Sequence, residues 1–399
     1  MKRVMKRMGL VLTSALTLGA CASATTATNA ATSDDAETVN IGGLWALSGS
    51  TASYGVVQDN AVKLAIDQRN AAGGIDGKEV TYTNYDDKGT GEESAAGTTY
   101  LAENGASVII GPATAAETFA AQPQAENMKV PMVSPSITTD GAEINDATGE
   151  VWEWFFKTCY AVTDQGTSLA QFTDDQGYET VALLTDNSTD HGQNLSQVFS
   201  ENVQADIVID EDYVSGDTDF KSILANVQAE DPDAIFIAGY YQEAGPIIKQ
   251  AREMGIDAPI IGGTGIGNQA LVDLAGAENV TDVYYSAMYV YSEDADQDVK
   301  DFVESYREAY GTEPDQFSAL AYDAANLVMD AIDRADSNDP DAIRAAIAET
   351  TDFDGICYDY TMNADHTVDA PAFIQELQNG EPTETAIMIS PEGEVTEVN

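Results

Sequence analysis

Residues 107–134 read SVIIGPATAAETFAAQPQAENMKVPMVS, and this stretch decides the fold. Two short runs rich in β-branched and apolar residues, 107–110 and 130–134, flank a helix-patterned segment at 115–127. A strand, a helix and a second strand in this order are typical of βα units with parallel strands. The stretch therefore indicates an α/β fold.

The same alternation extends on both sides of this stretch. Before it, the pattern predicts strands at 39–46 and 79–85 and helices at 56–70 and 92–104. A second block has expected strands at 180–185, 207–213, 234–238 and 259–261 and expected helices at 194–204, 219–229 and 243–254. A strand-like stretch at 283–290 leads to helices at 296–310, 316–335 and 341–349. The last fifty residues have the composition of strands and turns. Two successive blocks imply two doubly wound parallel sheets.

Composition and charge restrict the partners of this chain. It has 399 residues, of which 43% are hydrophobic, so it can bury sizeable cores in more than one domain. Asp and Glu number 68 against 17 Lys and Arg, which gives a formal net charge of −51. Such a surface repels the phosphates of nucleic acids and the headgroups of anionic lipids. We therefore expect neither a nucleic acid nor an anionic membrane surface to bind a broad area of this protein.

The N-terminus has the pattern of an export signal. Four basic residues within the first seven precede a mostly apolar run at 8–20 that is too short to span a bilayer, and Cys21 follows it. The segment resembles a bacterial lipoprotein signal, whose cysteine is lipidated and becomes the mature N-terminus. The alternative is an ordinary secretory signal cleaved after Ala20, Ala22 or Ala24. Residues 21–38 then form a flexible tether, which predicts an extracytoplasmic protein that touches the membrane through its lipid anchor only.

The motifs of several enzyme classes are missing. The sequence contains no GxSxG, no GxxxxGK[ST] and no HExxH, and it has two histidines, His191 and His366. We therefore expect no cofactor, no metal and no enzymatic activity. In open α/β sheets, ligands bind beyond the carboxyl ends of the strands. The loops to inspect are 46–55, 111–114, 135–138, 186–192, 239–242 and 262–267.

These loops and their neighbours carry a resemblance to a known family. Ten pieces occur in order: SYG at 53–55, AAGGIDGKEV at 71–80, YDDKG at 85–89, VIIGPAT at 108–114, VPMVSPSIT at 130–138, DQG at 164–166, GDTDF at 216–220, GYYQEAG at 239–245, QAREMGI at 250–256 and AYDAANLVMDAI at 321–332. Together they resemble the branched-chain amino acid (Leu/Ile/Val) solute-binding proteins of ABC importers, which have the type I periplasmic-binding fold. The resemblance covers about 39–389.

The resemblance implies two lobes joined by three hinge strands, which close over a ligand. Lobe 1 would comprise 39–158 and 288–353, and lobe 2 would comprise 159–287 and 354–399. Cys159 and Cys357 then fall near the first and third crossings, so a disulfide between them is one hypothesis. Two buried free thiols are the alternative.

The resemblance also assigns ligand contacts in lobe 1. Thr138 matches a threonine of the family's carboxylate cradle, and Ser136 supplies a backbone group for the ligand's ammonium. A serine of the cradle is replaced here by Ala115, so the main-chain N–H of Ala115 or Ala116 and the hydroxyl of Thr114 are the substitutes. Thr114 and Thr138 have an alternative interpretation as cap and turn residues.

Further positions would form the wall and the lid of the pocket. Trp45 and Tyr54 match wall positions, and the alternative interpretation of Trp45 is packing in the core. Tyr240 matches the aromatic that closes over the ligand. His191 stands where relatives carry tyrosine, or else is a solvated surface residue.

The acid that binds the ligand's ammonium in relatives is replaced by Thr264, and a second acidic position by Val162. Either Asp164 or Asp190 compensates for the missing charge, or the ligand lacks a free α-ammonium. In the second case the ligand is a carboxylate, a keto acid, an amide or another small polar molecule.

The resemblance thus predicts a monomeric, lipid-anchored receptor that delivers a small amino-acid-like ligand to the transmembrane subunits of an ABC permease. A branched-chain or hydrophobic amino acid is the expected ligand. The alternatives are import of a ligand without an ammonium group and a ligand sensor of the same fold that signals to a membrane receptor.

Overall fold

The structure is a computed structural model that describes residues 38–292, 294–390 and 393–398. The expected signal peptide, Cys21 and the expected tether up to residue 37 lie outside the described residues. Thr38, the last residue of the expected tether, is the first residue of strand β1.

The first sheet contains five parallel strands in the described part of the chain, in the order β2-β1-β3-β4-β7. The strands are β1 (Thr38–Trp45), β2 (Glu79–Asp86), β3 (Val108–Ile110), β4 (Met132–Ser134) and β7 (Phe155–Lys157). The helices that pack around them are α1 (Ala52–Ala71), α2 (Gly91–Glu103), α3 (Ala115–Met128), α9 (Gln297–Tyr310), α10 (Gln316–Ala335) and α11 (Pro340–Ala348). We call this sheet with its helices the first body.

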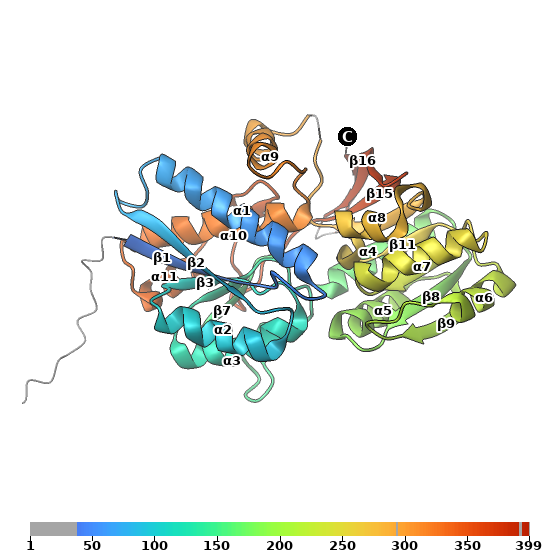
Figure 1. Cartoon of the computed structure of the whole chain (residues 1–399), viewed down its shortest axis with the longest axis horizontal. Helices are drawn as coiled ribbons and strands as arrows, with labels where there is room; N and C mark the ends of the chain where they lie inside the picture. Colours follow the sequence, from blue (N-terminus) through green and yellow to red (C-terminus); the bar gives the residue numbers. More distant parts are fainter. Residues whose placement is uncertain (1–37, 293, 391–392, 399) are drawn as a thin grey trace, which may run out of the picture. The chain divides into compact units, whose positions relative to one another are not determined.

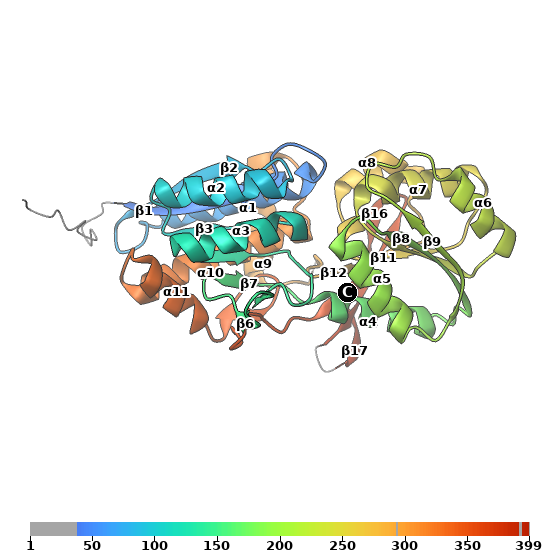
Figure 2. The same cartoon turned by 90° about the horizontal axis from the view of Figure 1, so that it is seen from below.

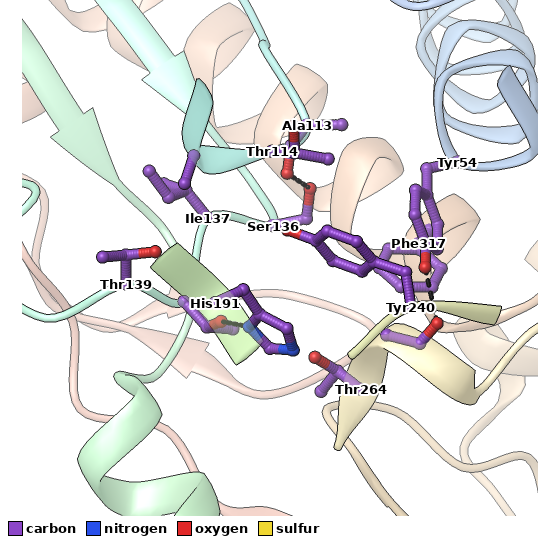
Figure 3. A pocket seen from close by; sticks show the side chains of 13 residues that line it. Tyr54, Ala113, Thr114, Ser136, Ile137, Thr139, His191, Tyr240, Thr264 and Phe317 are labelled. Atoms are coloured by element: carbon purple, nitrogen blue, oxygen red, sulfur yellow. Dashed lines mark hydrogen bonds between the residues drawn. The ribbon is translucent and has the colours of Figure 1, made fainter. Parts of the chain in front are cut away.

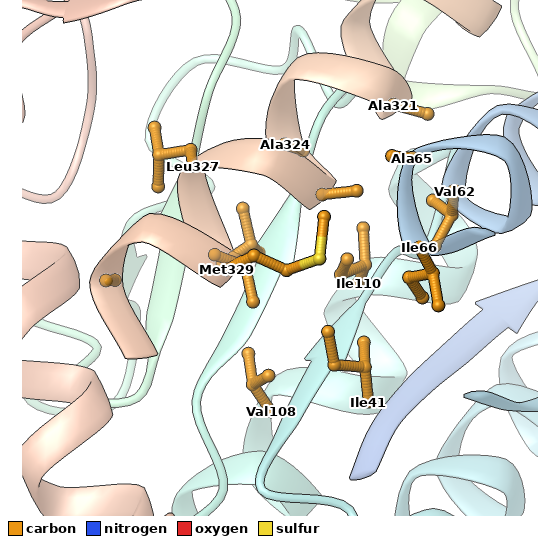
Figure 4. Close-up of a cluster of buried hydrophobic side chains, with 14 of the residues drawn as sticks. Ile41, Val62, Ala65, Ile66, Val108, Ile110, Ala321, Ala324, Leu327 and Met329 are labelled. Carbon is orange, nitrogen blue, oxygen red and sulfur yellow. The ribbon is translucent and has the colours of Figure 1, made fainter. Parts of the chain in front are cut away.

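Both faces of the first sheet are buried under helices. Successive side chains of a strand point to opposite faces, so each strand contributes to two core clusters. Ile41, Val108 and Ile110 pack with α1 and α10 in one core cluster (Figure 4). Leu44 and Ile109 lie on the other face, in a cluster with residues of α2 and α3. Figure 1 shows α1 and α10 above the sheet and α2 and α3 below it.

The second sheet has eight strands among the described residues, in the order β17-β16-β15-β12-β11-β10-β8-β9. Five of them are parallel: β8 (Thr180–Asp186), β9 (Asp206–Tyr213), β10 (Ala234–Ala238), β11 (Ile260–Gly262) and β12 (Val283–Ala287). The C-terminal strands β15 (Ala372–Gln378), β16 (Glu381–Ile389) and β17 (Val395–Val398) extend this sheet in antiparallel fashion. The predicted parallel sheet therefore has an antiparallel continuation.

Helices also cover both faces of the second sheet, and we call this assembly the second body. Its helices are α4 (Val162–Asp175), α5 (Asp190–Asn202), α6 (Lys221–Glu230), α7 (Tyr241–Glu253) and α8 (Gln269–Ala275). Residues of α6, α7 and α8 form one core cluster, and residues of α4 and α5 form another on the opposite face (Figure 2). The predicted α/β class with two doubly wound sheets is confirmed, whereas α4 and α8 were not predicted.

Shorter elements complete the chain. They are the hairpins β5 (Ile144–Asn145) with β6 (Glu150–Val151) and β13 (Phe353–Asp354) with β14 (Asp359–Tyr360), and the 3-10 turns η1 (Thr264–Ile266) and η2 (Ala277–Asn279). None of the described helices combines the length and the apolar composition that crossing a membrane would need.

The chain passes between the two bodies three times: after β7, after β12 and before β15. The division into lobes at 158, 287 and 353 stays a prediction. Tyr360, Met362 and Val368 follow the last of these boundaries but pack in the core of the first body. The third passage therefore lies between Val368 and β15.

Candidate functional site

A cavity lies where loops from both sheets meet. In each sheet the strand order reverses at one point, between β1 and β3 in the first and between β8 and β10 in the second. Loops separate at such a point and leave a crevice beyond the carboxyl ends of the strands. The cavity is lined by Tyr54, Ala113, Thr114, Ala115, Ser136, Ile137, Thr138, Thr139, His191, Tyr240, Thr264, Gly265 and Phe317.

The first body contributes the loop between β3 and α3. Thr114 is the N-cap of α3, and its main-chain N–H donates a hydrogen bond to Glu117 Oε2 at 3.0 Å. Ala115, the first residue of α3, lines the cavity. The first turn of a helix has main-chain N–H groups without acceptors inside the helix, and the helix dipole favours an anion there. The cavity therefore borders a helix N-terminus.

The loop after β4 forms the next part of the wall. The hydroxyl of Ser136 donates to Gln58 Oε1 at 3.1 Å and is 3.0 Å from the carbonyl oxygen of Ala113, so this hydroxyl already has protein partners. Behind the loop, Lys157 is 2% exposed, and its Nζ donates to the carbonyl oxygens of Thr138 at 3.2 Å and Thr139 at 3.3 Å. A buried ammonium therefore supports this loop from behind.

His191 lines the cavity from the second body. It follows β8 in the first turn of α5, and its ring stacks on Tyr240 with centroids 5.0 Å apart and planes 8° apart (Figure 3). Its Nδ1 lies 3.3 Å from the hydroxyl oxygen of Thr138, whereas Nε2 is buried without a hydrogen-bond partner among the described residues. Burial lowers the pKa of His191 to about 4, so the ring is neutral near pH 7.

Thr264 and Gly265 belong to η1, which follows β11. The main-chain N–H of Thr264 donates to Gln165 Oε1 at 2.8 Å, and Gln316 Nε2 donates to the carbonyl of Thr264 at 3.3 Å. A Cβ atom on Gly265 would lie 2.7 Å from the carbonyl oxygen of Gly239 and 2.8 Å from Tyr240 Cδ1. Only glycine fits at position 265 without a shift of the backbone.

Hydrogen bonds cross directly from one body to the other beside the cavity. The hydroxyl of Tyr54 in α1 donates to the carbonyl of Gly265 in η1. The carbonyl of Ser50 accepts from Tyr241 Oη at 2.8 Å and from Gln242 Nε2 at 2.6 Å. We call these three contacts the seam. They hold the loop before α1 against the first turn of α7, and the first turn of α1 against η1.

Aromatic rings fill the side of the cavity next to the seam. The ring centroid of Tyr54 is 4.8 Å from that of Phe317 and 5.8 Å from that of Tyr240 (Figure 3). Phe317 comes from the start of α10, which is capped by Asp315 through the N–H of Ser318. These rings form an apolar wall opposite the polar loops.

The remaining space is small. Its volume is about 20 Å³, which is room for roughly one water molecule. A molecule of amino-acid size therefore reaches the lining residues only when the two bodies move apart or the lining side chains rearrange.

The structure brings together most of the residues that the sequence predicted. Those in the lining are Tyr54, Thr114, Ala115, Ser136, Thr138, His191, Tyr240 and Thr264. Sequence reasoning missed Phe317, Ile137 and Thr139, together with Ala113 and Gly265. The aromatic residue at the start of a predicted helix was the only sequence signal for Phe317.

Four predicted positions lie elsewhere. Trp45 is buried in the core of the first body, where its Nε1 donates to Tyr82 Oη at 2.8 Å, so its assignment to the pocket wall is corrected. Ala116 is not part of the lining. Asp164 accepts the N–H of Ala161 at 3.1 Å at the start of α4, and Asp190 is exposed. Neither acid supplies a charge to the cavity wall.

The hypothesis of a disulfide is also corrected. Cys159 and Cys357 are free thiols in the described part of the chain. Cys159 donates through Sγ to the carbonyl of Ile137 at 3.0 Å, and the N–H of Cys357 donates to Asp323 Oδ2 at 2.9 Å. Across the described ranges, no group of three or more His, Cys, Asp and Glu side chains is arranged to hold a metal ion.

Comparison with known proteins identifies relatives over most of the chain. A family model described as "Periplasmic binding protein" matches residues 38–382. The leucine-specific-binding protein of Salmonella typhimurium is 27% identical over 250 residues, which cover 62% of this chain and 65% of that protein, about two thirds of its length. The leucine-, isoleucine-, valine-, threonine-, and alanine-binding protein of Pseudomonas aeruginosa is 24% identical over 79% of this chain and 83% of its own length.

Solved structures give the same result. The branched-chain amino acid transporter substrate binding protein LivJ of Streptococcus pneumoniae, in complex with isoleucine, is 35% identical with a TM-score of 0.84, over 90% of this chain and 100% of that chain. The leucine binding protein LivK of Thermotoga maritima is 28% identical with a TM-score of 0.78, over 86% of this chain and 97% of that chain. The fold and the sequence therefore point to one family.

Proposed function

Because the chain belongs to the periplasmic binding protein family, among the branched-chain amino acid substrate-binding proteins, we propose that it is the extracytoplasmic solute-binding receptor of an ABC importer. Its ligand is a small amino-acid-like solute with a hydrophobic side chain. One observation carries the proposal: a single cavity is lined by the strand-end loops of two separate sheets. A solute held there contacts both bodies at once.

Capture occurs by closure of the two bodies around the solute. The seam supports this mechanism because Tyr54, Tyr241 and Gln242 make their contacts only when the bodies are together. The volume of about 20 Å³ supports it too, because no amino-acid-sized molecule can reach the lining without separation or rearrangement of the walls. Binding energy between the solute and both bodies then favours the closed form.

The lining suits a solute with one apolar and one polar end. Tyr54, Phe317 and Tyr240 form the apolar wall, and a hydrophobic side chain buried there gains roughly 25 cal/mol per Å² of apolar surface. Thr114, Thr138 and the start of α3 face the polar end. Relatives named as leucine- or isoleucine-binding proteins support a hydrophobic solute of this size. The receptor needs no covalent chemistry for this task, and we expect it to act as a monomer.

Uptake in cells tests the import function. Deletion of the gene for this chain is expected to abolish high-affinity uptake of the solute, and a plasmid copy is expected to restore it. A plasmid copy carrying Tyr240→Ala, which removes the ring stacked on His191, is the matched loss-of-binding control. If the purified protein binds a solute but deletion leaves uptake unchanged, the import role is wrong and the sensor role of the same fold takes its place.

The lipid anchor has a separate test. We expect Cys21 to carry the lipid, so the wild-type protein should sediment with membranes, and a Cys21→Ala variant should accumulate as precursor or be released. The sequence after Cys21 then acts as the tether of the receptor. A Cys21→Ala variant that is processed and fractionates like the wild type would contradict the anchor and leave solute binding untouched.

A further inference from the structure

The described residues that line the cavity include no Asp, Glu, Lys or Arg. Among the described residues that line it, the ionisable side chains are His191, Tyr54 and Tyr240. Burial lowers the pKa of His191 to about 4 and raises the pKa of both tyrosines, so all three are neutral near pH 7. A solute enclosed here meets hydroxyl groups, main-chain groups, aromatic rings and one neutral imidazole.

The acids near the second-body side of the cavity have partners elsewhere. Asp186 accepts from the hydroxyls of Ser188 and Ser215, and Glu243 accepts the N–H of Gly216 at 2.7 Å. Asp164 accepts the N–H of Ala161 at the start of α4. None of these three acids is among the lining residues, so none is placed to accept a hydrogen bond from an ammonium group in the cavity.

Two buried acids lie behind the first-body wall. Glu117 accepts the hydroxyl of Thr51 and the N–H of Thr114, and Asp87 accepts the N–H of Gly89 at 2.9 Å. Burial raises the pKa of both carboxyls, that of Asp87 to about 7, so the pair carries less than its full negative charge near neutral pH. Glu117 is fully buried and does not line the cavity. Both carboxylate oxygens of Glu117 thus accept hydrogen bonds from the protein, and the carboxylate does not point into the cavity.

Groups that favour an anion are present on the same side. The N-terminus of α3 borders the cavity at Ala115, and α3 spans 14 residues. The buried Nζ of Lys157 lies behind Thr138 and Thr139, bonded to their carbonyls. Across the cavity, the buried Nε2 of His191 has no hydrogen-bond partner in the described ranges, so this neutral ring can make one hydrogen bond to a solute.

We propose that the solute is a small hydrophobic carboxylic acid whose second polar group is uncharged, such as a 2-oxo or 2-hydroxy acid, rather than an α-amino acid. Its carboxylate lies at the start of α3 beside Thr138, and its oxo or hydroxyl oxygen pairs with His191 Nε2. Its hydrocarbon chain lies against Phe317 and Tyr54. This inference rests on the proposed function and narrows its ligand.

The physical reason is the cost of an enclosed ammonium group. A buried charge without a counter-charge is strongly unfavourable, and neutral acceptors recover only part of the loss. A hydroxyl or oxo group in the same place is uncharged, so its transfer from water into the cavity does not carry the desolvation cost of a charge. It also satisfies the imidazole nitrogen that otherwise stays buried without a partner.

The test is calorimetry of the purified full-length protein, freed of bound solute, with molecules that share one carbon skeleton. The series is 4-methyl-2-oxopentanoate, 2-hydroxy-4-methylpentanoate and leucine. We expect the oxo or hydroxy acid to bind about 10- to 100-fold more tightly than leucine. Leucine binding as tightly as the two acids, or more tightly, overturns the inference and leaves the receptor function standing. If no carboxylic acid, amino acid or amide binds, the proposed function falls with it.

A charge variant gives a second measurement. In Thr264→Asp a carboxylate joins the wall, so leucine should gain about 10-fold in affinity and the oxo acid should lose affinity. Thr264→Asn, which has the same shape without the charge, is the matched control and should keep the preference of the wild type. An unchanged preference in a folded Thr264→Asp protein counts against the inference. Because Thr264 is 4% exposed, thermal unfolding is measured first, and if Thr264→Asp does not fold the wild-type series decides alone.

Discussion

The hydroxyl of Tyr54 donates a hydrogen bond to the carbonyl of Gly265, which lies 211 positions further along the chain and in the other body. Tyr54 also contributes its ring to the apolar wall, where it lies against Phe317 and Tyr240. One side chain therefore takes part both in the contact between the bodies and in the lining of the cavity. Closure and binding of a solute are expected to depend on each other through this residue.

Tyr54→Phe should weaken closure while the apolar wall stays in place. The variant loses one hydrogen bond, which contributes about 0.5–1.5 kcal/mol, so solute affinity should fall roughly 2- to 10-fold. Calorimetry measures the affinity, and small-angle X-ray scattering measures the fraction of closed protein at saturating solute. Tyr310→Phe is the matched control, because Tyr310 donates to the carbonyl of Asn60 within the first body. Equal losses in both variants would show that the effect is not specific to the seam.

His191→Gln should change how stability depends on pH. Burial lowers the pKa of His191 to about 4, below its ordinary value of 6.5. As pH falls from about 6.5 to about 4, the unfolded chain binds a proton that the native protein does not, so the wild type loses stability, at most about 3 kcal/mol. Glutamine has no such proton. Urea unfolding at several pH values should show the stability of the wild type falling relative to the variant across this window, and parallel curves would contradict the prediction.

Asp87→Asn should stabilise the protein at high pH. Asp87 is buried, its Oδ2 has no hydrogen-bond partner in the described part of the chain, and burial raises its pKa to about 7. Between about pH 4 and 7 the native protein holds a proton that the unfolded chain has released, so this group lowers stability as pH rises. The variant lacks this effect, and its gain over the wild type should grow with pH. Asp210→Asn, at an exposed position, is the control and should leave the pH profile unchanged.

Cys159 and Cys357 should be free thiols that react slowly with a thiol reagent in the native protein. In a Cys21→Ser protein, a thiol reagent should titrate two groups per chain after denaturation without reductant, because Cys159 and Cys357 are free. In the native protein both should react slowly, since burial raises the pKa of both thiols, that of Cys159 to about 12. If the denatured protein shows no thiol until a reductant is added, the two cysteines are bonded to each other and the prediction is wrong.

The sheets were predictable from sequence because inner strands such as β3, β4 and β10 are buried along their whole length and several helices carry regular apolar spacing. The helix α10 is an example, since its predicted and observed bounds coincide at 316–335. The helix α4 was missed for a physical reason. Its buried positions include Gln165, Gly166, Ser168 and Thr173, so the face that packs on the sheet has no continuous apolar stripe. Tertiary contacts decide such a helix, and a single sequence does not display them.

The candidate site was predictable where it depends on strand ends. His191 and Tyr240 follow neighbouring strands of one sheet, so their loops had to meet at one edge. Trp45 was assigned wrongly although the signal was present: it lies two and four residues from Gly43 and Ile41, and period two places it on the core face with Ile41. Phe317 reaches the cavity only because α10 packs along α1, a contact between distant segments that no local pattern reports.

The three contacts of the seam have three donors but only two acceptors. Ser50 and Gly265 accept through main-chain carbonyls, which every amino acid possesses. Mutational drift at position 50 therefore leaves its acceptor in place, whereas position 265 admits no side chain at all. The strength of the seam contacts can therefore change mainly through the donors at 54, 241 and 242. A laboratory selection for altered release rates should find its mutations there.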